Sequence, residues 1–215
     1  MEKIMYDKFK KYYFKDRDAD NISNDFVDVI VDSNEVFVKY FKEGKGRLQV
    51  AQETGTHKNI VGSMMSTNIE RIIVLYDIFE RTNGDVNLIK SLLDVKFLDK
   101  YADDIVGLHN KGIKNPLMYA RFTKCYFPKL MGKLDKVSKS YIKFVDELVS
   151  RRKILKQYFK DNKSAKEIAE ETGIVEHSVM DKVYWEKHYV RRCYQHYLEV
   201  LLEKKNRQSA LNNKK

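Results

Sequence analysis

Two stretches of the chain, YFKEGKGRLQVAQETG at residues 40–55 and YFKDNKSAKEIAEETG at residues 158–173, are identical at eight of their sixteen positions. The similarity continues back along the chain without a gap. Residues 26–55 and 144–173, aligned at a constant offset of 118, share twelve identical residues in thirty. Because self-similarity at one fixed offset indicates a repeated structural unit, we predict an internal duplication.

The end of each repeat has the spacing of two crossing helices joined by a tight turn. In IAEETGIVEHSVMDKV, residues 168–183, Ile168 and Ala169 are predicted to face inward, with alanine small enough to let a second helix cross closely. Gly173 is expected to end the first helix in a left-handed conformation. The buried positions predicted for the second helix are Ile174, Val179 and Val183. This pattern is typical of a helix-turn-helix.

The first copy keeps the same spacing. Its corresponding residues are Val50, Ala51, Gly55, Thr56 and Val61, with Thr56 in place of the usual apolar residue. We therefore predict two helix-turn-helix modules, at about residues 22–72 and 140–190.

RRKILKQYFKDNKSAKEIAEETGIVEHSVMDKV, residues 151–183, resembles the DNA-binding region four of sigma factors and the related response-regulator helix-turn-helix. The resemblance covers about residues 140–190 and, more weakly, residues 22–72, and the promoter-opening region-two pattern is not found. It implies binding to double-stranded DNA in transcription regulation or sigma-like promoter recognition, with RNA polymerase as a candidate partner.

Composition agrees with a helical protein that binds polyanions. The chain has two prolines and nine glycines in 215 residues, too few for the turns of an all-β fold. Its 41 Lys and Arg against 31 Asp and Glu give a net charge of +10, which attracts nucleic acid. Lys-biased composition with good solubility is the alternative explanation.

Several other classes of protein are not indicated. Cys125 and Cys193 are isolated, and the chain lacks common metal, nucleotide and hydrolase motifs, so we expect no enzyme, no metal and no cofactor. No run of eighteen apolar residues or secretory leader is found, so we expect a cytoplasmic protein without a membrane segment.

The expected organisation is all-α. We predict residues 1–82 as an amino-terminal helix (2–15) plus the first module, with Ser23 as a helix N-cap; residues 83–136 as a helical connecting segment; and residues 137–215 as the second module with a long carboxy-terminal helix. The second helix of this module is expected to run on into that long helix, and QSALNNKK to be frayed. The stripe of the long helix predicts either core packing or a homo-oligomer seam; its residues are Val183, Val190, Tyr194, Tyr197 and Leu201.

DNA contacts follow from the helix-turn-helix geometry, in which the first exposed positions of the second helix face bases. The base-facing candidates are His57, Lys58, Asn59 and Ser63 in the first copy and Glu176, His177, Met180 and Asp181 in the second. The phosphate-facing candidates are Lys45, Arg47, Lys163, Lys182, Arg151, Arg152, Arg191 and Arg192. The carboxylates of the second copy make the two copies unequal, since acids near phosphates are costly.

Three functions therefore remain open. The first is sequence-selective binding to double-stranded DNA by tandem modules. The second is a packaging, replication or partition protein that marks a DNA site for a larger machine. The third is a protein-interaction module whose helix-turn-helix copies have lost DNA.

Overall fold

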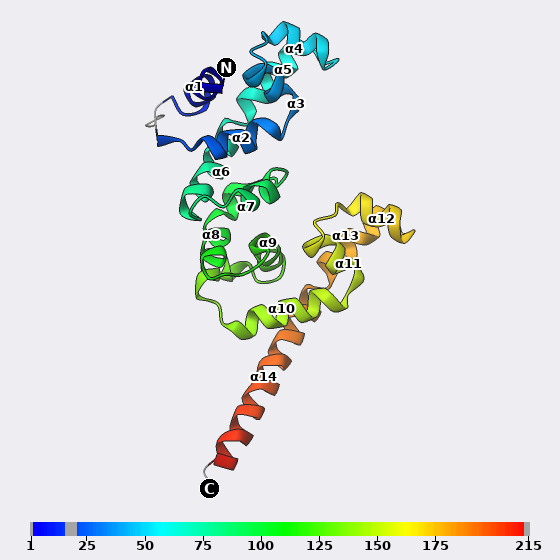
Figure 1. Ribbon diagram of the computed structural model, residues 1–215. Coiled ribbons are helices and arrows are strands. Elements are labelled where there is room, and N and C mark those ends of the chain that lie inside the picture. The colour runs from blue at the N-terminus through cyan, green and yellow to red at the C-terminus, as the bar shows by residue number, and fades with distance from the viewer. Residues whose placement is uncertain (1, 16–20, 213–215) are drawn as a thin grey trace. The chain divides into compact units, whose positions relative to one another are not determined.

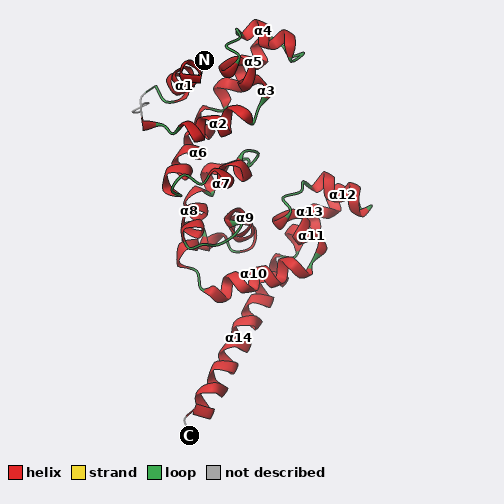
Figure 2. Ribbon diagram, viewed as in Figure 1, coloured by secondary structure: helices red, strands yellow, loops and turns green. Residues whose placement is uncertain are grey.

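The computed structural model describes residues 2–15 and 21–212 of the chain. Every regular element among these residues is helical, and none is a strand (Figure 2). The last element, α14 (Lys187–Asn212), is the longest helix in the part of the chain described. The predicted all-α fold with a long carboxy-terminal helix is confirmed.

The chain divides into two compact units, residues 1–106 and 107–215 (Figure 1). The first unit contains α1 (Glu2–Tyr13), α2 (Asn24–Asp32), α3 (Glu35–Phe37), the π-helical turn η2 (Val38–Lys42), α4 (Arg47–Glu53), α5 (Lys58–Thr67), α6 (Ile69–Arg81), α7 (Val86–Leu92) and the 3-10 turn η3 (Leu98–Lys100). The boundary between the units falls within α8 (Ala102–Asn110). Residues 83–136, predicted as a connecting segment, are therefore divided between the two units.

The second unit repeats the order of the first. Its elements are α9 (Pro116–Tyr126), η4 (Pro128–Leu130), η5 (Leu134–Lys136), α10 (Lys139–Arg151), α11 (Lys153–Leu155), the π-helical turn η6 (Lys156–Lys160), α12 (Ala165–Thr172), α13 (Glu176–Trp185) and α14. The turns η2 and η6 lie 118 residues apart, as do the starts of α5 and α13 and of α6 and α14. The structural repeat thus continues two helices beyond the segment in which the sequences are clearly alike.

The turn after each π-helix has the same left-handed backbone conformation in both copies. Gly44 and Asn162, again 118 residues apart, have φ angles of 69° and 53°. Glycine and asparagine are the residues that adopt this left-handed conformation most readily. The two residue types differ, but each satisfies the same backbone requirement.

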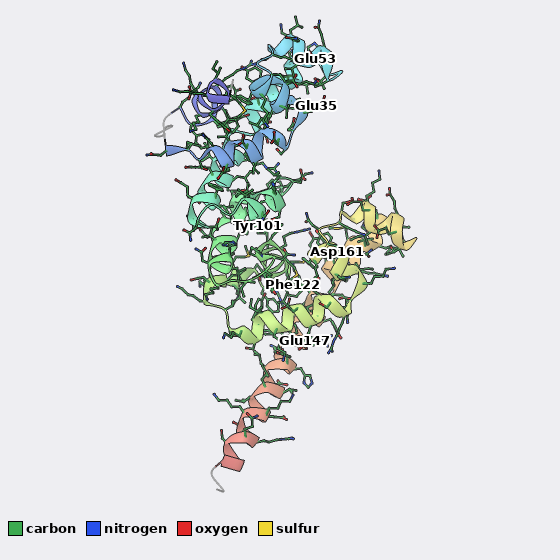
Figure 3. The ribbon with its side chains drawn as sticks, viewed as in Figure 1. Glu35, Glu53, Tyr101, Phe122, Glu147 and Asp161 are labelled. Atoms are coloured by element: carbon green, nitrogen blue, oxygen red, sulfur yellow. The ribbon has the colours of Figure 1, made fainter. Side chains whose placement is uncertain are left out.

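Helices α1 and α9 begin the two units with matching aromatic cores. The ring centroid of Phe9 lies 5.1 Å from that of Phe41, and the ring centroid of Phe122 lies 5.4 Å from that of Phe159, with edge-on geometry in both cases (Phe122 is labelled in Figure 3). Phe9 and Phe122 are both fully buried. Edge-on aromatic pairs stabilise a core beyond the area that they bury.

Polar contacts at the edge of these cores are also repeated. The Tyr6 hydroxyl donates to Asp28 at 3.0 Å, and the Tyr119 hydroxyl donates to Asp146 at 2.7 Å. A cation lies over the next aromatic ring in each unit, Lys8 over Tyr40 and Arg121 over Tyr158. Residues 5–14 and 118–127 are identical at six of ten positions, but at an offset of 113, so alignment at 118 alone misses them.

The repeat also includes α6 and α14, although their sequences have diverged. Tyr76 of α6 lies 5.0 Å from Phe26, and Tyr194 of α14 lies 4.9 Å from Phe144, measured between ring centroids. Each tyrosine is thus packed against the first helix of the sequence repeat. In the carboxy-terminal stripe, Val183 and Val190 are buried core residues, and the remaining three members are half-buried.

Three local expectations need correction. Ser23 lies at the N-cap of α2, but its side chain makes no capping hydrogen bond. Helix α13 ends at Trp185 and α14 begins at Lys187, so α13 does not run on into the long helix. The tail segment predicted to fray is helical from Gln208 to Asn212, and its last three residues lie outside the described residues.

Candidate nucleic-acid interface

In the first unit, α4 and α5 are joined by a tight turn at Gly55. Gly55 has a φ of 64°, and the Thr56 backbone N–H donates to the Ala51 carbonyl at 2.9 Å. The Thr56 hydroxyl lies 2.8 Å from that of Thr54, so the polar residue at this position has a hydrogen-bond partner. Val61, fully buried, fixes α5 against the rest of the unit. The turn therefore holds the amino end of α5 in one orientation.

The amino end of α5 carries the four base-facing candidates of the first copy. His57 is the N-cap, and its Nδ1 accepts from the Asn59 backbone N–H at 3.3 Å. The side chains of Lys58, Asn59 and Ser63 make no hydrogen bond or ion pair within the described part of the chain. These three residues and His57 are all exposed. Unpaired donors at a helix N-terminus are suited to anions and base edges.

Arg47, at the start of α4, lies beside the same helix. A Cβ atom placed on Gly62 of α5 would be 3.6 Å from Arg47 Nη1, so the guanidinium lies over α5 where glycine leaves room. Arg47 is exposed and makes no ion pair with any described residue. Of the predicted phosphate-facing residues, it is the one that flanks α5 with an unpaired charge.

In the second unit, α12 and α13 have the same connection with better capping. Ser164 and Glu167 form a reciprocal capping box at the start of α12, whereas Gly46 at the start of α4 has no side chain to cap with. These hydrogen bonds from Ser164 lower the pKa of the Glu167 carboxyl. Gly173 ends α12 with a φ of 70°, as predicted.

The exposed surface of α13 differs from that of α5. Glu176 and His177 are exposed, Met180 and Asp181 are half-buried, and His177 Nε2 lies 3.4 Å from Asp181. Two of the four base-facing candidates therefore face each other. Large apolar side chains are exposed at the ends of this helix; they are Val175, Tyr184 and Trp185, with Trp185 81% exposed.

The two helix pairs, α4–α5 and α12–α13, also differ in net charge. Residues 45–67 contain three cations and one carboxylate, whereas residues 163–185 contain three cations and five carboxylates. The first helix pair is therefore net positive and the second net negative at neutral pH. Phosphates are attracted to the first and repelled by the second.

Two predicted phosphate-facing lysines are engaged within their own units. Lys45 Nζ lies 2.5 Å from Glu53, which also bonds Lys39, and Lys163 Nζ lies 2.5 Å from Glu171 (Glu53 is labelled in Figure 3). Hydrogen bonds from these lysines lower the pKa of Glu53 and of Glu171. The first ion pair connects the loop after η2 to α4, and the second connects the loop after η6 to α12. Each residue of the second pair lies 118 positions after its counterpart in the first.

Two predicted phosphate-facing arginines also bond within the second unit. Arg152 bonds Glu186 at 2.6 Å and lies over the Tyr189 ring, and Arg191 Nε donates to the Tyr126 carbonyl at 2.8 Å. Besides Arg47, three members of that set have no ion pair within the described residues; they are Arg151, Lys182 and Arg192. Arg151 belongs to α10 and Arg192 to α14, so neither is part of α13.

Metal and membrane sites were also sought. Among the described residues, no group of three His, Cys, Asp or Glu side chains lies close enough to hold a metal ion. Within the same residues, no helix combines the length and apolar character needed to cross a bilayer.

Comparisons with protein-family models, with curated proteins and with solved structures gave no match.

Proposed function

We propose that the chain binds double-stranded DNA with sequence selectivity through α5 of the first unit, as a transcription regulator or a sigma-like promoter-recognition factor. The observation that carries the proposal is the set of exposed, unpaired donors at the amino end of α5. Lys58, Asn59 and Ser63 belong to this set, and Arg47 flanks it.

These groups have complementary roles on a duplex. An α-helix fits the major groove, where Asn59 can pair in bidentate fashion with an adenine and Lys58 can donate to a guanine or a phosphate. Arg47 would bind a backbone phosphate and so set the register of α5. The net charge of +10 adds the sequence-independent attraction on which DNA-binding proteins depend.

The second unit has a different role in this proposal. The carboxylates of α12 and α13 oppose phosphates, while exposed Val175 and Trp185 suit a protein surface. We assign DNA recognition to the first copy and protein contact to the second, with RNA polymerase as the partner that the sigma-factor resemblance implies. The sequence-based hypothesis of two tandem DNA-binding modules is thereby reduced to one DNA-binding module, which we call the reader.

The test is DNA selection followed by paired substitutions. A site is first selected from random duplexes with the full chain, and its affinity is measured by fluorescence anisotropy. The double variant Lys58→Ala/Asn59→Ala should lose about tenfold to several hundredfold in affinity, since a good base contact provides about 1–3 kcal/mol. The matched variant Glu176→Ala/Asp181→Ala should stay within about twofold of the parent chain.

All four substituted residues are at or near the surface, so thermal unfolding by circular dichroism serves as the folding control. Equal losses from both double variants, or no loss from the first, would contradict the assignment. An affinity that does not change with salt would favour the third function, a protein-interaction module, because phosphate contacts make DNA binding fall steeply with salt.

A further inference from the structure

An open groove lies between α10 and α14 in the second unit. Its volume is about 460 Å³. It is lined by Phe144, Glu147, Leu148, Arg151, Cys193, His196, Tyr197 and Val200, together with the Arg152–Tyr189 pair (Glu147 is labelled in Figure 3). In Figure 1, α14 extends past α10, and no other described helix of its unit lies beside its carboxy-terminal part.

The equivalent groove of the first unit is filled by α7. That helix packs against α2 and α6, the counterparts of α10 and α14. Its residues Leu88, Ile89 and Leu92 are buried, and Arg71 Nη2 donates to the Leu92 carbonyl at 3.4 Å. A helix with apolar residues at positions i, i+1 and i+4 is therefore the natural occupant of this site in the repeated fold.

Residues at equivalent positions of the two grooves differ in how far they are buried. Ile30, Leu75 and Thr82 of the first unit are almost completely buried. The residues 118 positions later are Leu148, Cys193 and Val200, and each is only half-buried. Among the described elements of the second unit, none occupies the place that α7 takes in the first.

The groove has also become more polar at its edges. Glu147 replaces Val29 and His196 replaces Ile78, while the floor has Leu148 in place of Ile30 and Val200 in place of Thr82. The side chain of His196 is 78% exposed. An apolar floor with a polar rim is typical of a surface that binds its partner reversibly.

We propose that this groove binds an amphipathic α-helix of another protein, with an α7-like apolar stripe and a carboxylate near its carboxyl end. The position of the carboxylate follows from the first unit, where Asp94 lines one pocket with Ser33 and Asn34. The counterparts of Ser33 and Asn34 are Arg151 and Arg152. Arg151 has no ion pair within the described residues, so an acid at the place of Asp94 would meet an available cation.

Segments of the same chain suit the groove less well. In α7 the apolar stripe is already buried in the first unit. The end of α14 is exposed but carries Lys204 and Lys205, which would bring like charge to Arg151. Charge complementarity therefore favours an acidic helix from a partner over a second copy of this chain.

The probe for the test is a fluorescein-labelled peptide of residues 85–95, DVNLIKSLLDV, titrated with the full chain and followed by anisotropy. We expect saturable binding. Val200→Glu should weaken it at least tenfold, because the substitution puts a carboxylate on the apolar floor. Leu202→Glu is the matched control on the same helix, exposed and outside the groove, and should change affinity by no more than about twofold.

Charge exchange tests the orientation of the helix. Arg151→Glu should weaken the parent peptide about threefold to tenfold, and a peptide with Asp94→Lys should recover most of that loss. Circular dichroism would show that the variants remain folded. Selected-site DNA affinity should be unchanged in Val200→Glu, which makes failure of this proposal distinguishable from failure of the DNA-binding proposal.

Three outcomes would overturn the inference. They are the absence of saturable peptide binding, binding that Val200→Glu leaves intact, and a dimer in sedimentation equilibrium that Val200→Glu converts to a monomer. The last result would assign the groove to a second copy of the chain, the homo-oligomer considered from the sequence.

Discussion

In the first unit, α5 presents a lysine, an asparagine and a serine from a net positive helix pair. In the second unit, α13 occupies the equivalent place in the element order and presents a glutamate, a histidine whose Nε2 lies 3.4 Å from Asp181, and an exposed tryptophan from a net negative pair. The turns and π-helices of the two units lie at equivalent positions, and an edge-on phenylalanine pair is repeated in the two cores. Buried positions specify the fold, and exposed positions are free to diverge in function.

The same contrast applies to a second site in each unit. Helix α7 fills the groove between α2 and α6, whereas the groove between α10 and α14 is open and has a polar rim. One unit is therefore self-contained at this site, and the other has a surface available to a partner. Both differences fit the proposal that the first unit binds DNA and the second contacts protein.

The largest expected effect tests whether the two cores are equivalent. Phe41 and Phe159 are each 2% exposed and each meets the phenylalanine of the preceding aromatic helix. Phe41→Ala and Phe159→Ala should each destabilise their own unit by about 3–5 kcal/mol, the usual cost of truncating a buried phenylalanine. Urea unfolding of the full chain measures both, and a loss below about 1 kcal/mol at either position would break the equivalence.

A smaller effect separates two tyrosines that occupy equivalent places. The Tyr126 hydroxyl donates to the Val183 carbonyl at 2.8 Å, whereas the buried Tyr13 hydroxyl has no hydrogen-bond partner among the described residues. Burial raises the pKa of both hydroxyls, so both stay protonated near neutral pH. Tyr126→Phe should destabilise its unit by about 1 kcal/mol, and Tyr13→Phe should be neutral or stabilising. Shifts of the same sign and size in thermal unfolding would contradict this difference.

Helix capping gives the next difference. Ser164→Ala should destabilise α12 by about 1 kcal/mol, because it removes the capping box with Glu167. Gly46→Ser should stabilise α4 by only a few tenths of a kcal/mol, since Gln49 at the third position can complete a similar box and glycine is itself a tolerable cap. Urea midpoints measure both, and a stabilising Ser164→Ala would exclude the capping role.

The smallest expected effect concerns the matched ion pairs. Glu53 and Glu171 have pKa values below the ordinary 4.5, so their stabilisation is present above pH 4.5 and is lost as the pH falls through the folded-state pKa. Glu53→Gln and Glu171→Gln should each flatten the acid side of the stability curve and leave its slope near pH 7 unchanged. Thermal unfolding from pH 3 to pH 7 measures this, with exposed Glu70→Gln as a control. An unchanged acid slope in both variants would exclude the proposed linkage.

The sequence predicts the helix pairs because their identities fall on turns and buried positions such as Gly55, Gly173 and Ala51. After these glycines the repeat can no longer be recognised from the sequence, because Val61/Val179 is the single identity in the next thirteen aligned positions. Buried sites there accept different apolar residues, such as Met65 and Val183. The correspondence of α1 with α9 is missed because five extra residues between Phe127 and Phe144 change the offset.

For the candidate site, helical spacing predicts that Lys58, Asn59 and Ser63 are exposed. Spacing cannot predict that Lys45, Lys163, Arg152 and Arg191 find partners in their own units, because those partners lie on other elements. The groove of the second unit is missed for a similar reason, since it is formed by residues of two separate helices, α10 and α14, and has no sequence motif.

The most direct test of the account is a hydroxyl-radical footprint of the full chain on a duplex selected from random DNA. One reader should protect the backbone sugars that flank one major-groove segment, and Lys58→Ala/Asn59→Ala should abolish the protection. Two protected segments at a fixed spacing, or protection that survives the double substitution, would contradict the assignment of DNA to the first unit alone.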